Sequence, residues 1–179
     1  MHSVTAFKLS LLMKNNNNQN AVNALLAEYE KAIIELQYVI QDISQEELTF
    51  TVDQETINPD CKSIQTILSH VVSSGYSYCV YIQNFKNKNT VRPEKVNRSS
   101  IADYINDLNK ILKFTQETFA TIDDDALEEW DASKKIMTSW GQLYDIEQLM
   151  EHAIVHILRH RRQIKKFKTT IKQLQTTEQ

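Results

Sequence analysis

Glycine and proline are nearly absent from this chain. Two of each occur among its 179 residues, whereas a β-sandwich or β-barrel needs such residues at many turns. Leu, Ile, Lys, Glu and Gln are plentiful, and they favour long uninterrupted helices. The composition therefore predicts an all-α protein. The length suits one domain, and 41% hydrophobic with 24% charged residues is ordinary for a soluble globular protein.

Four segments place apolar residues at spacings of three and four, which is the pattern of an amphipathic helix. They cover about residues 21–42, 62–85, 100–119 and 142–174. The third begins at Ser100, which has the spacing of a capping box with Asp103. Four helices that each carry one apolar stripe bury those stripes most economically in a four-helix bundle. We expect this bundle over residues 21–174.

The two ends of the chain are expected to lie outside the bundle. Residues 1–20 include an Asn-rich run and are predicted to be a poorly ordered or weakly packed extension. Residues 175–179 are predicted to be a C-terminal tail. Met13 followed by Lys14 resembles an ordinary protein start, so residues 1–12 are interpreted as an upstream extension that adds nothing to the fold.

Two long connections are expected, at residues 43–61 and 121–141. Each is long enough to cross one end of the bundle, so the sequence leaves the topology open. The second contains Trp130 and Trp140, which are expected to anchor it to the helices.

Charge and cysteine content limit the classes of partner. The formal net charge is −3 and the pI is near 6.0, so we expect no nucleic-acid partner and no anionic membrane. No apolar run approaches the roughly 20 residues that span a bilayer. Lys8 interrupts the apolar start, and no small-residue cleavage site follows it. Cys61 and Cys79 form no metal or redox motif, which suits a cytoplasmic protein.

A basic cluster occupies the last predicted helix: Arg159, Arg161, Arg162, Lys165, Lys166, Lys168 and Lys172. It could bind phosphate or nucleic acid, but cations near a helix C-terminus also interact favourably with the helix dipole. We favour the second interpretation, with the acidic residues 123–129 pairing with some of these cations. Arg162 is kept as a candidate for recognising an anionic substrate. A homodimer formed through an apolar helix face is compatible with the pattern.

The last helix also carries three of the five histidines, at intervals of four. Such neighbours lie about 40° apart around a helix and about 6 Å apart along it, so two imidazoles can share one metal ion. On a helical wheel His156 and His160 face the apolar stripe, whereas His152 falls toward the flank. His70, in the second helix, lies at the boundary of its own stripe, and His2 is left at the terminus.

Spacing alone leaves two interpretations of these histidines open. A pair four residues apart also arises by chance, and a single buried histidine is more often a hydrogen-bonded core residue than a ligand. A di-iron carboxylate centre is disfavoured because no Glu-x-x-His occurs, and because Glu147 and Glu151 lie off the inward face.

Two segments carry a resemblance to the DinB/YfiT-like family of helical bundles. They are Ser63-Ile-Gln-Thr-Ile-Leu-Ser-His70-Val-Val and His156-Ile-Leu-Arg-His160-Arg-Arg-Gln163-Ile164, and helix order agrees over about residues 21–174. The resemblance implies one divalent metal, often nickel or zinc, held by His70, His156 and His160. This chain differs in having Arg162 where many relatives carry Gly. It also has Tyr76, Tyr78 and Tyr81, which are expected to pack or to line a cleft, where several relatives have a tryptophan.

Three neutral imidazoles suit Zn²⁺ or Ni²⁺, with Fe²⁺ and Mn²⁺ less favoured, and leave a position open for water. The resemblance implies a metal-dependent hydrolase or a transferase of a low-molecular-weight thiol, acting on a small-molecule substrate. No residue stands out as the general base. The alternative is a catalytically silent bundle, with a structural metal or none, that acts in stress response or association.

Overall fold

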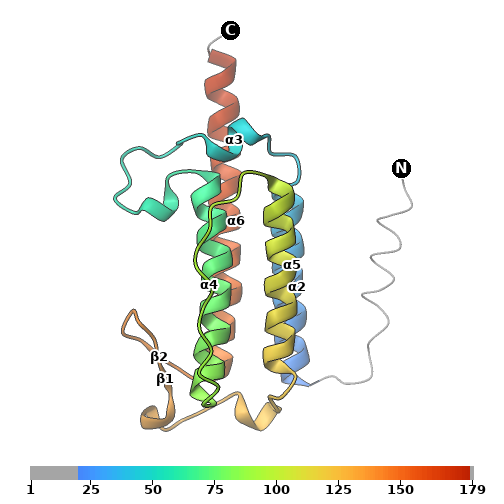
Figure 1. The fold of residues 1–179 in the computed structure, drawn as a ribbon, viewed down its shortest axis with the longest axis vertical. Helices are drawn as coiled ribbons and strands as arrows, with labels where there is room; N and C mark the ends of the chain where they lie inside the picture. The colour runs from blue at the N-terminus through green and yellow to red at the C-terminus, as the bar shows by residue number, and fades with distance from the viewer. Residues whose placement is uncertain (1–19, 178–179) are drawn as a thin grey trace, which may run out of the picture.

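The computed structural model describes residues 20–177. Within them the chain forms four long helices, α2 (Ala21–Ile40), α4 (Ile64–Phe85), α5 (Ile101–Phe119) and α6 (Ile146–Thr177). Between them lie a short helix α3 (Gln45–Thr49), three 3-10 turns (Pro59–Cys61, Asp124–Ala126 and Ala132–Lys134) and a hairpin of β1 (Ile136–Met137) and β2 (Leu143–Tyr144). The all-α four-helix bundle is confirmed (Figure 1).

Two expectations concern the chain ends. Most of the predicted extension at residues 1–20 lies outside the described residues, as do 178 and 179. Asn20 is described, and its side chain caps α2 by accepting a hydrogen bond from Asn23 N. At the other end, α6 continues through the first residues of the predicted tail, to Thr177.

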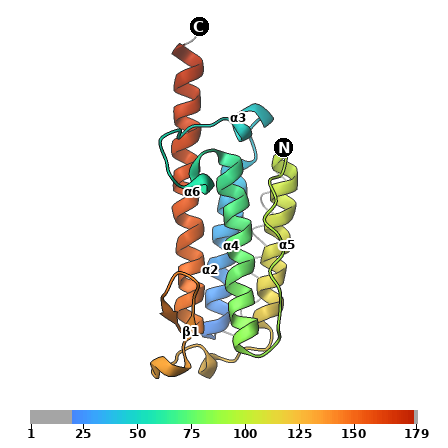
Figure 2. The ribbon, with the colours of Figure 1, turned by 60° about the vertical axis from the view of Figure 1, so that its left-hand side comes forward.

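The four long helices form a ring in which α2 lies between α5 and α6, and α4 lies across from α2. α2 and α6 run in one direction, while α4 and α5 run in the other (Figures 1 and 2). The connections at 43–61 and 121–141 therefore join helices on opposite corners, each across one end of the bundle.

Residues 86–100, here called the crossover segment, join two helices that run in parallel. This segment travels the whole length of α4 before α5 begins (Figure 2). Asn87 and Asn89 start the return with φ of 61° and 50°, a left-handed conformation that Asn adopts more readily than most residues. The sequence pattern showed this stretch only as a break between helices.

Serine residues cap the N-termini of two of the four long helices. Ser63 and Thr66 form a complete capping box at α4. At α5, Ser100 accepts from Asp103 N as predicted, while its hydroxyl donates to the Asp103 carboxylate at 2.7 Å. By accepting these bonds, the serine side chains provide partners for backbone N–H groups of the first helical turn, which have no acceptor within the helix.

The core is built from the predicted stripes. Leu36, Leu68, Leu108 and Leu149, one from each long helix, have no exposed surface, and burial of a leucine side chain stabilises a fold by about 1.5–3 kcal/mol. α4 and α5 approach closely at Gly75, where an added Cβ would lie 2.7 Å from Ile111 Cδ1.

The two tryptophans of the last connection behave differently. Trp140, at the tip of the hairpin, packs edge-on against the rings of Tyr78 and Tyr81 on α4, so it anchors the connection as expected. Trp130 is 89% exposed, and the same expectation is wrong for it. It lies between the 3-10 turns Asp124–Ala126 and Ala132–Lys134.

Two cations of α6 pair with carboxylates on or just after α2. Arg161 pairs with Glu35 of α2, and Lys168 pairs with Asp42 in the turn that follows α2. The predicted pairing with the acidic residues 123–129 is therefore wrong for these two cations, because the packing of α2 against α6 brings these carboxylates beside them. Among residues 20–177 no helix is long and apolar enough to cross a membrane.

Candidate metal centre

His70, His156 and His160, the histidine trio, come together between two antiparallel helices. His70 lies in the second turn of α4, and the other two lie one turn apart in the middle of α6. One ring nitrogen from each lies within 4.8 Å of those of the other two. The Nε2 atoms of His70 and His156 are 2.9 Å apart. The structure thus brings together the three residues that the sequence singled out.

Two members of the trio have a hydrogen-bond partner on their other nitrogen. His70 Nδ1 lies 3.2 Å from Asp60 Oδ2 and donates to it. His160 Nδ1 lies 3.0 Å from Gln163 Oε1, one turn further along α6. Because an oxygen acceptor favours the tautomer with a proton on Nδ1, both rings keep a lone pair on Nε2.

Burial keeps the trio neutral. Removal from water, together with the nearby His160 and His70, lowers the pKa of His156 to about 3. The same causes, burial and then His70, lower the pKa of His160 to about 4. Burial also lowers the pKa of His70, although Asp60 opposes this shift. Imidazoles must be neutral to bind a metal ion, so the site needs no deprotonation at neutral pH.

The donor set fits a divalent ion of intermediate softness. Zn–N bonds are about 2.0–2.1 Å long, so two of them in a tetrahedral site separate their nitrogens by about 3.3–3.4 Å. The nitrogen separations in the trio bracket this value, from 2.9 Å between His70 Nε2 and His156 Nε2 up to 4.8 Å at most. Three imidazole nitrogens suit Zn²⁺ or Ni²⁺.

His152 lies beside the trio rather than in it. Its ring stacks on Trp140 with centroids 5.6 Å apart, and its Nδ1 lies 3.1 Å from Tyr144 Oη. The side chains of the hairpin thus fix the His152 ring on α6. Tyr78 packs edge-on against His156 and at a tilt against His152. Burial raises the pKa of its phenol, which therefore stays protonated.

The remaining predicted residues lie elsewhere. Arg162 is exposed, and the cation that lowers the pKa of all three histidines is Arg159. Arg159 also lies closer to the histidines in angle around α6 than Arg162 does, and recognition of an anionic substrate by Arg162 stays a prediction. Tyr76 packs on Phe114 of α5, and Tyr81 accepts a hydrogen bond from Ser139 N.

Sequence reasoning missed Asp60 and Lys95. Asp60 belongs to the turn Pro59–Cys61, and its other oxygen pairs with Lys95 of the crossover segment. Neither residue lies on a periodic stripe, so no pattern marked them. The only available signal was an acidic residue next to Pro59, shortly before the histidine helix.

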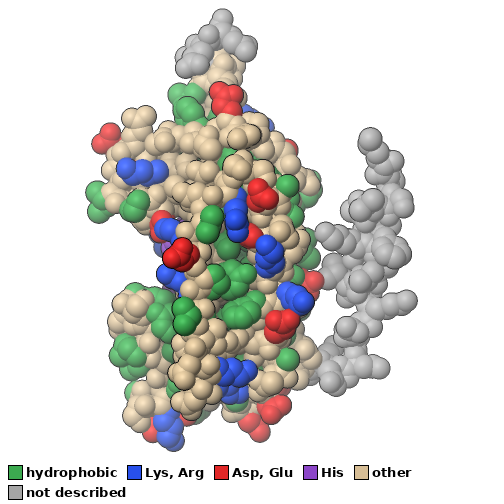
Figure 3. Space-filling model, viewed as in Figure 1, with side chains coloured by type: hydrophobic (Ala, Val, Ile, Leu, Met, Phe, Trp, Pro, Cys, Tyr) green, Lys and Arg blue, Asp and Glu red, His purple; other side chains and the backbone are tan. Residues whose placement is uncertain are grey.

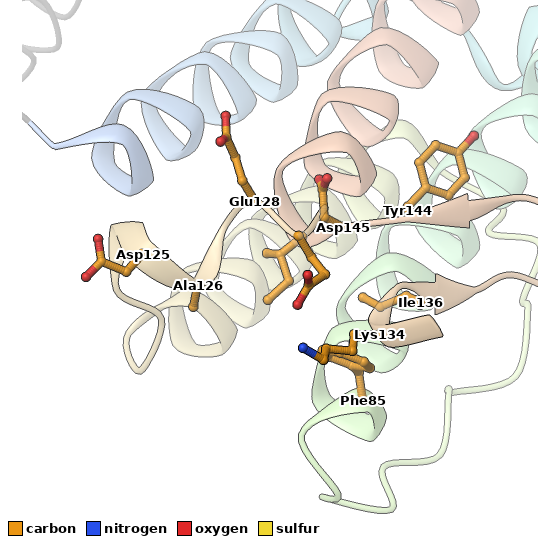
Figure 4. A pocket seen from close by; sticks show the side chains of 10 residues that line it. Phe85, Asp125, Ala126, Glu128, Lys134, Ile136, Tyr144 and Asp145 are labelled. Carbon is orange, nitrogen blue, oxygen red and sulfur yellow. The ribbon is translucent and has the colours of Figure 1, made fainter. Parts of the chain in front are cut away.

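The trio is reached from the surface. His70 has 28% of its side chain exposed, and Figure 3 shows a notch in the outline of the molecule with histidine surface at its edge. A separate hollow of about 110 Å³ lies at the start of α6, lined by residues that include Phe85, Glu128 and Asp145 (Figure 4). It holds none of the histidines, and His156 lies about 15 Å further along α6.

Comparison with known proteins agrees with this architecture. A family model described as the DinB family matches residues 13–174, which is most of the chain. No curated protein and no solved structure gives a significant match. The chain belongs to the DinB family.

Proposed function

We propose that this protein binds one divalent metal ion through His70, His156 and His160, and that it is a metal-dependent hydrolase or a transferase of a low-molecular-weight thiol. The observation that carries the proposal is the convergence of three neutral imidazoles within 4.8 Å, from helices far apart in sequence. Family membership is compatible with it. Zinc or nickel is the expected ion.

The residues around the trio suit such a role. Asp60 and Gln163 hold two of the rings in a fixed orientation, and partners of this kind tune metal ligands in many proteins. Three protein ligands leave room for a substrate group, and a bound divalent ion supplies Lewis acidity for hydrolysis or for activating a thiol. The partly exposed His70 gives a small molecule access to the site.

One observation favours a different function. His70 and His156 can form a hydrogen bond with each other in the absence of a metal, because one Nε2 can donate to the other across 2.9 Å. In the described residues no buried side-chain nitrogen or oxygen lacks a hydrogen-bond partner. A bundle with a structural metal or none, acting in stress response or association, is the second candidate.

Metal analysis of protein purified without a histidine tag separates the two. The first candidate predicts about one equivalent of zinc or nickel per chain after loading, and its loss in His70→Ala, His156→Ala and His160→Ala. His152→Ala is the matched control, since it removes a histidine from the same helix that is outside the trio. It should retain the metal.

Two results would contradict the proposal: a folded protein that takes up no metal, or equal uptake by His156→Ala and the unchanged protein. Activity is then screened on the loaded protein with ester, amide and thiol substrates. Turnover that is lost with the metal and restored with it assigns the reaction class. Full metal occupancy without turnover of any ester, amide or thiol substrate favours the catalytically silent bundle.

A further inference from the structure

We propose that Asp60 is a positioning residue for the metal centre, which orients His70 and increases its affinity for the ion. The inference rests on the proposed function. It starts from the contact between Asp60 Oδ2 and His70 Nδ1, 3.2 Å long, on the side of the ring opposite His156. The carboxylate therefore binds one ring nitrogen of His70, while the other ring nitrogen faces His156.

The backbone around Asp60 is fixed by local hydrogen bonds. Asn58 caps the 3-10 turn by accepting from Asp60 N at 3.0 Å, and Cys61 N donates to Asn58 O at 3.0 Å. The next residue, Lys62, accepts from Val52 N and Asp53 N through its carbonyl oxygen. The turn is thus hydrogen-bonded to the preceding connection, which fixes the backbone position from which the Asp60 side chain extends.

The crossover segment holds the other side of the carboxylate. Lys95 pairs with Asp60 Oδ1, which leaves Oδ2 for His70. The segment is itself pinned to α4 next to Lys95, because Ser69 Oγ donates to Val96 O at 3.0 Å. Residues from α4, the turn before it and the crossover segment therefore meet at one carboxylate.

The chemistry of this contact differs from that at His160. A carboxylate that accepts from Nδ1–H fixes the tautomer and makes the ring a stronger donor at Nε2. His160 has the neutral amide of Gln163 in the same role, which fixes the tautomer with less electrostatic effect. Removal of Asp60 should consequently weaken metal binding more than removal of Gln163.

The test measures metal affinity in the full-length protein. Zn²⁺ and Ni²⁺ are titrated in competition with a chromogenic chelator, using the unchanged protein, Asp60→Ala, Asp60→Asn, Gln163→Ala and Lys95→Met. We expect Asp60→Ala to weaken binding by roughly 10- to 100-fold. Asp60→Asn keeps an acceptor without the charge, so its metal affinity should lie between those of Asp60→Ala and the unchanged protein. Lys95→Met, which does not touch His70, should change affinity less than Asp60→Asn.

A second readout separates orientation from general destabilisation. The visible absorption spectrum of the Co²⁺-loaded protein reports ligand geometry, and it should change in Asp60→Ala but not in Lys95→Met. If Asp60→Ala does not fold, Asp60→Asn decides the question by the same two measurements. Unchanged affinity and spectrum in the Asp60 variants overturn this inference while leaving the trio intact. Absence of metal binding in the unchanged protein overturns the proposed function itself.

Discussion

Tyr104 Oη lies 2.6 Å from Ser69 Oγ, at the point where α5 and α4 begin side by side. The same hydroxyl donates to Gln65 O and accepts from Arg98 N, each at 3.0 Å. The tyrosine side chain has no exposed surface. One hydroxyl thus ties the end of the crossover segment to the helix that carries His70.

Substitution of Tyr104 by Phe should destabilise the protein by about 1–3 kcal/mol, because it removes the hydroxyl that bonds two partly buried backbone groups, Arg98 N and Gln65 O. Urea denaturation of the metal-free protein measures the change. Tyr38→Phe is the matched control, since Tyr38 is 73% exposed. Equal stabilities of the two variants would show that the hydroxyl makes no net contribution.

Asp124 caps a helix that lies far from it in sequence. Its carboxylate accepts from Ala21 N at 2.9 Å and from Val22 N at 3.1 Å, in the first turn of α2. Loss of a capping side chain costs about 1 kcal/mol, so Asp124→Ala should lower the free energy of unfolding by that amount. The neighbouring Asp125→Ala is the control, and it should have little effect. A larger loss in Asp125→Ala would contradict the assignment of the cap.

The two cysteines should differ in their reaction with iodoacetamide. Cys79 is 2% exposed, and burial raises the pKa of its thiol to about 11. The thiolate is the reactive form, so a raised pKa keeps Cys79 unreactive until the pH approaches 11. Cys61 is only half-buried and should be alkylated first. Peptide mass spectrometry after labelling at pH values up to about 9 measures both; equal labelling would contradict the prediction.

The helices and two members of the trio could be predicted from the sequence because a helix repeats every 3.6 residues. That period places His156 and His160 on one face whatever surrounds them. His70 was at the edge of its stripe, a position that also suits an uninvolved surface histidine, so the resemblance was needed to favour it as the third ligand. The structure agrees with that boundary position, since its side chain is partly exposed.

The contacts behind the trio could not be predicted in this way. Asp60 and Lys95 come from irregular connections, where side-chain direction follows no period. They meet because the crossover segment runs back along α4, a topology that connection length alone does not reveal. The hairpin that carries Trp140 has strands of two residues, which is too short for an alternating pattern.

A metal ion that binds the trio should stabilise the folded protein. A ligand at 100 times its dissociation constant adds about 2.7 kcal/mol, and each kcal/mol raises Tm by about 2–4 °C in a domain of this size. Excess Zn²⁺ or Ni²⁺ should therefore raise Tm by roughly 5–10 °C, as followed by circular dichroism. His156→Ala should show no increase, whereas His152→Ala, which keeps all three proposed ligands, should respond like the unchanged protein. An equal increase in His156→Ala would place the stabilising ion outside the trio.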